Sequence, residues 1–154
     1  MNSDPLTVQQ IFQERSQYRV PFYQRAYVWT KINQWNRLWE DIRDKADALL
    51  QGEDPGAHFM GAVVLEQQKK VGLLGVDRLH IIHGQQRLTT LQYVLVSLQH
   101  ILRQLAQPTL LPLVDGCVVN GNPDTMIDKD LERFKLWPTF RDRDQFISGM
   151  TATT

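Results

Sequence analysis

The middle of the chain contains the segment His80-Ile81-Ile82-His83-Gly84-Gln85-Gln86-Arg87-Leu88-Thr89-Thr90-Leu91. Its two adjacent isoleucines predict the end of a buried strand. From Arg87 to about residue 106, leucines recur at alternating spacings of three and four, which predicts a helix with one apolar face. Gly84 separates the two elements and permits a sharp turn or the close approach of a ligand. The segment therefore predicts a strand, a glycine turn and a helix.

This junction is a candidate anion-binding site. The first backbone N–H groups of a helix have no partner within the helix, and the helix dipole favours negative charge there. Arg87 adds a planar, charged group that suits phosphate or carboxylate. The spacing excludes a Walker loop and a dinucleotide-binding fingerprint, because Gly84 is the single glycine between Gly75 and Gly116. From these residues alone, an ordinary structural junction is the more common explanation.

Residues 82–91 resemble the Asp-Gly-Gln-Gln-Arg-Leu-Thr-Thr-Leu signature in the N-terminal domain of GmrSD-type, type IV restriction endonucleases. A second block, Val20-Pro21-Phe22-Tyr23-Gln24-Arg25-Ala26-Tyr27-Val28-Trp29, resembles the same family. Further similar segments are Gln34-Trp35, Leu38-Trp39-Glu40-Asp41-Ile42, 58–65 and 136–139. The resemblance extends from about Pro5 to Met150. One position departs from it, because the signature's aspartate is His83 here.

The resemblance implies an α+β domain with a ParB/sulfiredoxin-like mixed sheet flanked by helices. In that fold, a Gly-x-x-Arg turn between a strand and a helix binds nucleotide phosphates, and residues 84–87 have this spacing. The implied nucleotide-binding residues are Gln24, Arg25, Gly84 and Arg87. The implied catalytic positions, which would orient the nucleotide or an attacking water, are His83, Gln85 and Gln86.

The resemblance also implies a function. The domain would bind a nucleoside triphosphate with Mg²⁺, and its nucleotide state would gate a DNA-cleaving nuclease domain or subunit in defence against phage with modified DNA. By this resemblance the chain would be an NTPase. However, His83 replaces the signature's aspartate, and histidine is a poorer Mg²⁺ ligand than aspartate. We therefore expect nucleotide binding with little or no hydrolysis, because position 83 is a histidine.

Two other classes of function stay open. One is a catalytically inactive fragment that acts only as a protein-interaction domain, which His83 and the lack of a nuclease region favour. The other is a direct DNA-binding module, whose basic residues would be Arg15, Arg19, Arg25, Lys31 and Arg37. Lys plus Arg and Asp plus Glu number 17 each, so no net charge attracts the chain to DNA. The four histidines have no HNH-like arrangement, so we expect no nuclease site within this chain.

Composition indicates a soluble, cytoplasmic protein. Apolar residues make up 42% and charged residues 22% of the chain, as in ordinary globular domains. The single cysteine, Cys117, excludes an intramolecular disulfide and a cysteine-rich zinc site, and it suggests a reducing compartment. No apolar run approaches the roughly 20 residues that a membrane-spanning helix needs.

The remaining elements follow from local patterns. We expect a helix that starts at Asp4-Pro5, a helix capped by Thr30 with a buried apolar stripe, and a final helix from residue 141. Expected strands cover residues 18–20, 58–66, 78–82, 117–119 and 134–138. Residues 1–150 would form one nucleotide-binding domain, and residues 151–154 would be the truncated end of a longer protein.

Overall fold

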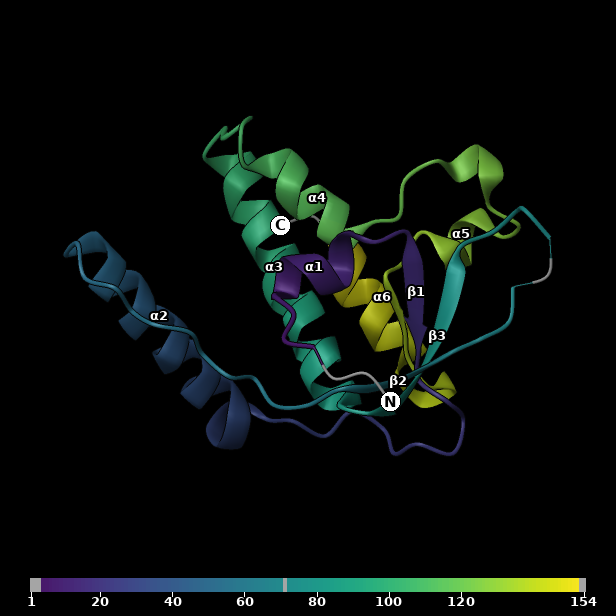
Figure 1. Ribbon diagram of the computed structural model, residues 1–154, viewed down its shortest axis with the longest axis horizontal. Helices are drawn as coiled ribbons and strands as arrows, with labels where there is room; N and C mark the ends of the chain where they lie inside the picture. Colours follow the sequence, from purple (N-terminus) through teal and green to yellow (C-terminus); the bar gives the residue numbers. More distant parts are fainter. Residues whose placement is uncertain (1–3, 71, 153–154) are drawn as a thin grey trace. The chain divides into compact units, whose positions relative to one another are not determined.

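The computed structural model describes residues 4–70 and 72–152, which form two compact units (Figure 1). The larger unit comprises Met1–Ala26 and Ala62–Thr154, and the smaller one comprises Tyr27–Gly61. Each unit is described separately below. The assignment of residues 1–150 to one nucleotide-binding domain stays a prediction, and the last two residues of the expected end lie outside the described residues.

The larger unit contains a mixed four-stranded sheet in the order β2-β3-β1-β4. β1 pairs in parallel with β3 and with β4, whereas β2 is antiparallel to β3. The strands are β1 (Ser16–Arg19), β2 (Val64–Gln67), β3 (Asp77–His83) and β4 (Leu136–Trp137). Helices accompany this sheet, so the expected α+β class with a mixed sheet is confirmed.

One face of the sheet is apolar and carries the core. Ile81 and Leu136 are fully buried on it, and Tyr18 lies between them in the strand order. Phe12 from α1 (Val8–Gln13) packs edge-on against Tyr18, with ring centroids 5.6 Å apart. A capping box at Thr7 starts α1, so the expected start at Asp4-Pro5 was wrong.

The long helix after the glycine turn is α3 (Gln85–Gln104), as predicted. It packs against α4 (Leu111–Val118) and α6 (Arg143–Thr151), and Figure 1 shows these helices together on one side of the sheet. The leucine stripe of α3 is buried only in part. The side of α3 that contacts α4 instead carries two buried glutamines. Gln92 Nε2 donates to the Cys117 carbonyl at 3.1 Å, and Gln99 Nε2 donates to an Asp115 carboxylate oxygen at 2.6 Å.

Two expected strands differ from the structure. Residues 117–119 are not a strand, because Cys117 and Val118 form the last turn of α4, whose first turn contains Pro112. Their side chains are buried against the rest of the unit, which a helix achieves as well as a strand. The strand expected over 58–66 is β2, which begins only at Val64.

Three short elements complete the larger unit. They are η2 (Pro123–Thr125), α5 (Lys129–Glu132) and η3 (Phe140–Asp142). The strand expected over 134–138 is reduced to the two residues of β4. The final helix, α6, begins at Arg143, two residues later than expected, because the chain first forms the 3₁₀ turn η3.

The smaller unit consists of η1 (Lys31–Trp35), α2 (Asn36–Leu50) and a return segment. Lys45 Nζ ties the return segment to α2 by hydrogen bonds to the carbonyls of Pro55 and Gly56, at 2.6 and 3.0 Å. Leu38 is the one buried residue of α2 among those described, and Trp39 is 62% exposed. Within its own unit the expected stripe is therefore not buried, because the return segment is too small to cover it.

Candidate functional site

The turn between β3 and α3 has the geometry that the sequence predicted. Gly84 has a φ of +99°, in the left-handed region that favours glycine. A Cβ at this position would lie 2.9 Å from Val63 Cγ2 and 3.3 Å from the Ala62 carbonyl oxygen. Both the backbone conformation and the packing against residues 62–63 therefore require a glycine.

Two glutamines in the first turn of α3 hold the upstream block. Gln85 and Gln86 are only 8% and 7% exposed. Gln85 Nε2 donates to the Arg25 carbonyl at 2.9 Å, and Gln86 Nε2 donates to the Ala26 carbonyl at 3.1 Å. Gln24, in the upstream block, also contacts the strand before the turn: its Nε2 donates to the Ile82 carbonyl at 3.0 Å. The two blocks of the signature, about sixty positions apart, thus meet at the helix start.

Arg87 is half-buried in the same turn. One terminal nitrogen of its guanidinium group donates to the Ala62 carbonyl at 3.0 Å. Among the described residues, its other N–H groups have no hydrogen-bond acceptor within the chain. This arrangement anchors the side chain while leaving donors of the planar fork for an external anion.

Arg25 and His83 lie at the margins of the turn, and both are exposed. The backbone of Arg25 is held by Gln85, while its side chain extends from the loop. A shared cleft between the guanidinium groups of Arg25 and Arg87 stays a prediction. His83 is the last residue of β3, opposite Val64 in β2.

The residues of the turn itself, 83–87, include no aspartate or glutamate. No side chain caps α3, and its first turn contains no aspartate or glutamate. In the described part of the chain, no group of three or more His, Cys, Asp or Glu side chains is placed to hold a metal ion. The helix start and Arg87 suit an anion, and position 83 presents an imidazole where a divalent cation prefers oxygen ligands.

The sequence matches the model of the family described as the GmrSD restriction endonuclease, N-terminal domain, over residues 8–153. The chain belongs to this family. Membership in this restriction endonuclease family supports a role of the chain in restriction and phage defence. None of the curated proteins matches the chain. Among the described helices of this GmrSD N-terminal domain, none is long and apolar enough to cross a membrane.

Of the basic residues considered for DNA contact, Arg15 has a structural role in this GmrSD N-terminal domain. Its guanidinium group donates to the carbonyls of Gly75 at 3.0 Å, Gly121 at 3.3 Å and Asn122 at 3.4 Å. It thereby connects the ends of loops that are far apart in the sequence. Its N–H donors are used inside the chain rather than presented to DNA.

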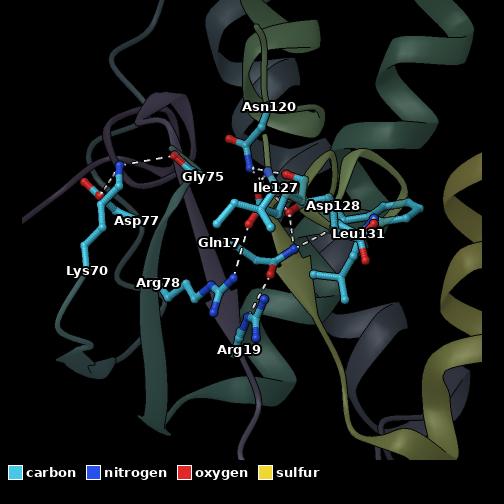
Figure 2. A network of polar contacts seen from close by, with 12 residues as sticks. Gln17, Arg19, Lys70, Gly75, Asp77, Arg78, Asn120, Ile127, Asp128 and Leu131 are labelled. Atoms are coloured by element: carbon cyan, nitrogen blue, oxygen red, sulfur yellow. Dashed lines mark hydrogen bonds and ion pairs between the residues drawn. The ribbon is translucent and has the colours of Figure 1, made fainter. Parts of the chain in front are cut away.

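A buried polar network on the other face of the sheet escaped sequence reasoning (Figure 2). Gln17 and Glu132 are fully buried, and Gln17 Nε2 donates to the Leu131 carbonyl at 2.7 Å. The two Glu132 carboxylate oxygens accept from Arg78 at 3.2 Å and from the Ile127 backbone N–H at 3.0 Å. In sequence these are scattered polar residues, so no motif or period signals them.

One buried cation lies beside this network. Lys135 is 2% exposed, and its Nζ donates to the Glu14 carbonyl at 2.7 Å. Burial lowers the pKa of Lys135 to about 8, and the nearby Cys117 and Glu14 oppose that shift. The pKa of the Cys117 thiol is raised by its own burial.

Proposed function

We propose that this chain binds a nucleoside triphosphate at the turn of residues 84–87 and that its nucleotide state regulates a DNA-cleaving partner. The partner would be a nuclease domain or subunit, and DNA would be engaged indirectly through it. The observation that carries the proposal is the meeting of the two signature blocks at the start of α3.

The contacts at the turn support distinct roles. The N-terminal amides of α3 and the guanidinium group of Arg87 would bind the phosphates, since both favour negative charge. Gln85 and Gln86 would act as positioning residues, because their amide nitrogens hold the backbone of Arg25 and Ala26. Gln24 would position the upstream block further, because its side chain donates to the Ile82 carbonyl. Arg25 would then add a second positive charge near the phosphates.

The turn itself supplies no carboxylate to a divalent cation, since its residues 83–87 include no acidic side chain. A divalent cation prefers carboxylate, carbonyl and water oxygens, and position 83 presents an imidazole instead. We therefore expect triphosphate binding that depends weakly on Mg²⁺, with little or no hydrolysis. The nucleotide would then act as a bound signal rather than as a consumed substrate.

Calorimetric titration with the common nucleoside triphosphates tests the proposal. Arg87→Ala should weaken binding by about 1.5–3 kcal/mol, the range for a hydrogen bond to a charged group. Arg87→Lys should restore only part of the affinity, since an ammonium group lacks the planar fork. Arg103→Ala is the matched control, because Arg103 lies in the last turn of α3. Equal affinities for the native chain and Arg87→Ala would rule out this site.

A protein-interaction domain is the second candidate function. The α2 helix favours it, because large apolar side chains are exposed even within their own unit. Leu49 is 63% exposed and Leu50 is 86% exposed. If none of the nucleoside triphosphates binds the native chain in the titration, this candidate replaces the first.

A further inference from the structure

Arginine side chains gather on the polar face of the sheet, away from the proposed nucleotide turn. The parallel register pairs Gln17 with Arg78 across β1 and β3, and it pairs Arg19 with Trp137 across β1 and β4. Paired residues on adjacent strands project to the same face, with strands about 4.8 Å apart. Figure 2 shows the guanidinium groups of Arg19 and Arg78 beside each other, next to the amide of Gln17.

Arg143 reaches the same region from the start of α6. Its guanidinium carbon lies 5.3 Å from the centroid of the Trp137 ring and 5.5 Å from that of Phe140. Within the described residues, Arg143 Nε is buried and has no hydrogen-bond partner. A buried donor without an acceptor is costly, so this N–H group suggests an acceptor that the chain does not supply.

The charges on this face do not balance. Burial lowers the pKa of Arg19, and the positive charges of Arg78 and Arg143 lower it further, against the opposing effects of Glu132 and Asp128. Both Glu132 oxygens already accept hydrogen bonds, and an Asp128 oxygen accepts from a backbone N–H in α5. The one acceptor that Arg19 Nε contacts is the neutral Gln17 Oε1, at 2.8 Å. Arg19 and Arg143 therefore retain capacity for an external anion, whereas Arg78 already pairs with Glu132 at 3.2 Å.

We propose that this face binds a phosphate group between Arg19, Arg78 and Arg143. A phosphate offers several acceptor oxygens and at least one negative charge, which suits guanidinium forks that approach from different elements. Arg143 Nε would gain the acceptor that it lacks, and Arg19 would gain a charged partner. This site uses other side chains than the turn at residues 84–87, because Arg19 and Arg78 project from the sheet face opposite the one that carries Tyr18 and Ile81.

Side-chain NMR of the ¹⁵N-labelled chain tests this site. Sodium phosphate is titrated at constant ionic strength, with chloride as the balancing anion, and the Nε–H signals of Arg19 and Arg143 are followed. Both signals should shift saturably with phosphate and not with chloride. Arg19→Gln should weaken the phosphate affinity measured from the Arg143 signal by about tenfold or more. Arg19→Lys should weaken it by less, because the positive charge is kept. Arg103→Gln, which removes the same charge from the last turn of α3, should leave it unchanged.

The source of the phosphate is distinguished by repeating the titration with ATP and with a short oligothymidylate. If ATP saturates the Arg143 signal at a lower concentration than the oligothymidylate does, the phosphate belongs to a free nucleotide. If the oligothymidylate saturates it at the lower concentration, the phosphate belongs to a nucleic-acid backbone. Each of these results supports the phosphate site. A static Arg143 signal with all three ligands, or an equal shift in Arg19→Gln, would overturn it.

The two proposed sites can fail separately. Arg87→Ala should leave the response of Arg143 to inorganic phosphate intact. Conversely, Arg19→Gln should leave the calorimetric affinity for a triphosphate at the turn intact. Backbone spectra of each variant show whether the fold is retained, so a loss of response can be assigned to the side chain.

Discussion

In the proposed site, we expect position 83 to affect turnover more than nucleotide binding. The side chain is exposed at the end of β3, one residue before the left-handed Gly84. Phosphate contacts would come from the amides of α3 and from Arg87, neither of which depends on residue 83. An aspartate there would supply an anionic oxygen ligand, which an imidazole does not.

His83→Asp should therefore make triphosphate binding more dependent on Mg²⁺ and raise phosphate release. The measurement is a phosphate-release assay on both forms, with and without Mg²⁺, beside a binding titration. His100→Asp is a matched control, because His100 lies near the opposite end of α3 from the turn. Turnover by the native chain as fast as by His83→Asp would show that position 83 is not catalytic.

Lys135 should give the protein an unusual dependence of stability on pH. Its folded-state pKa is about 8, below the ordinary value of 10.5 that applies to the unfolded chain. Between these values the unfolded state binds more protons, so the free energy of unfolding rises with pH. From pH 7 to pH 9 the expected gain is about 1 kcal/mol. From about pH 8 upward the raised pKa of Cys117 works in the opposite direction, because the thiol of the unfolded chain begins to ionise there.

Urea unfolding at pH 7, 8 and 9 measures this gain. Lys135→Met, which keeps a long apolar stem without the amine, should abolish the rise. Lys129→Met should retain it, because Lys129 is exposed and forms only a surface ion pair with Asp124. A native chain whose stability stays flat over this range would contradict the assignment to Lys135.

At the scale of elements, the β3–α3 turn depends on Gly84. Its φ of +99° is unfavourable for any other residue, and a Cβ would press against Val63. Gly84→Ala should lower the free energy of unfolding by about 1–3 kcal/mol, the cost of a strained backbone conformation. It should also weaken triphosphate binding, because the amides of α3 would move. Gly121→Ala is the control, since it has open space and no positive φ.

Denaturant unfolding of both variants, followed by nucleotide titration, distinguishes strain from a general effect of adding a methyl group. A loss of stability in Gly121→Ala equal to that in Gly84→Ala would show that the turn has no special requirement.

At the scale of the whole molecule, Arg15 connects segments that the sequence separates by more than a hundred positions. Arg15→Met should lower the free energy of unfolding by about 1–3 kcal/mol, because it leaves the Gly121 carbonyl without its donor and removes one donor each from Gly75 and Asn122. The Gly75 carbonyl still accepts from Lys70, and the Asn122 carbonyl from Thr125. Any affinity for DNA should be unaffected. Arg37→Met is the control, since Arg37 is exposed in α2. A variant that keeps its stability but loses DNA binding would restore the DNA-binding interpretation of Arg15.

Local patterns were sufficient for the α+β class, for the existence and type of β3 and α3, with ends within two residues, and for the glycine turn between them. Strand and helix periods, and the freedom of glycine at positive φ, are properties of neighbouring residues, so a single sequence displays them. The resemblance of the two signature blocks likewise led to the family. Short apolar runs such as 117–119 were misassigned, because helix and strand can both bury three residues.

The tertiary structure decided what the polar side chains do. It directed the amides of Gln85 and Gln86 to the loop at Arg25, and it placed Arg19, Arg78 and Arg143 around one face of the sheet. It also showed that the smaller unit does not bury the apolar stripe of its own helix α2. Hydrogen-bond partners and burial depend on segments that are distant in the chain, and the sequence of one element does not contain its neighbours.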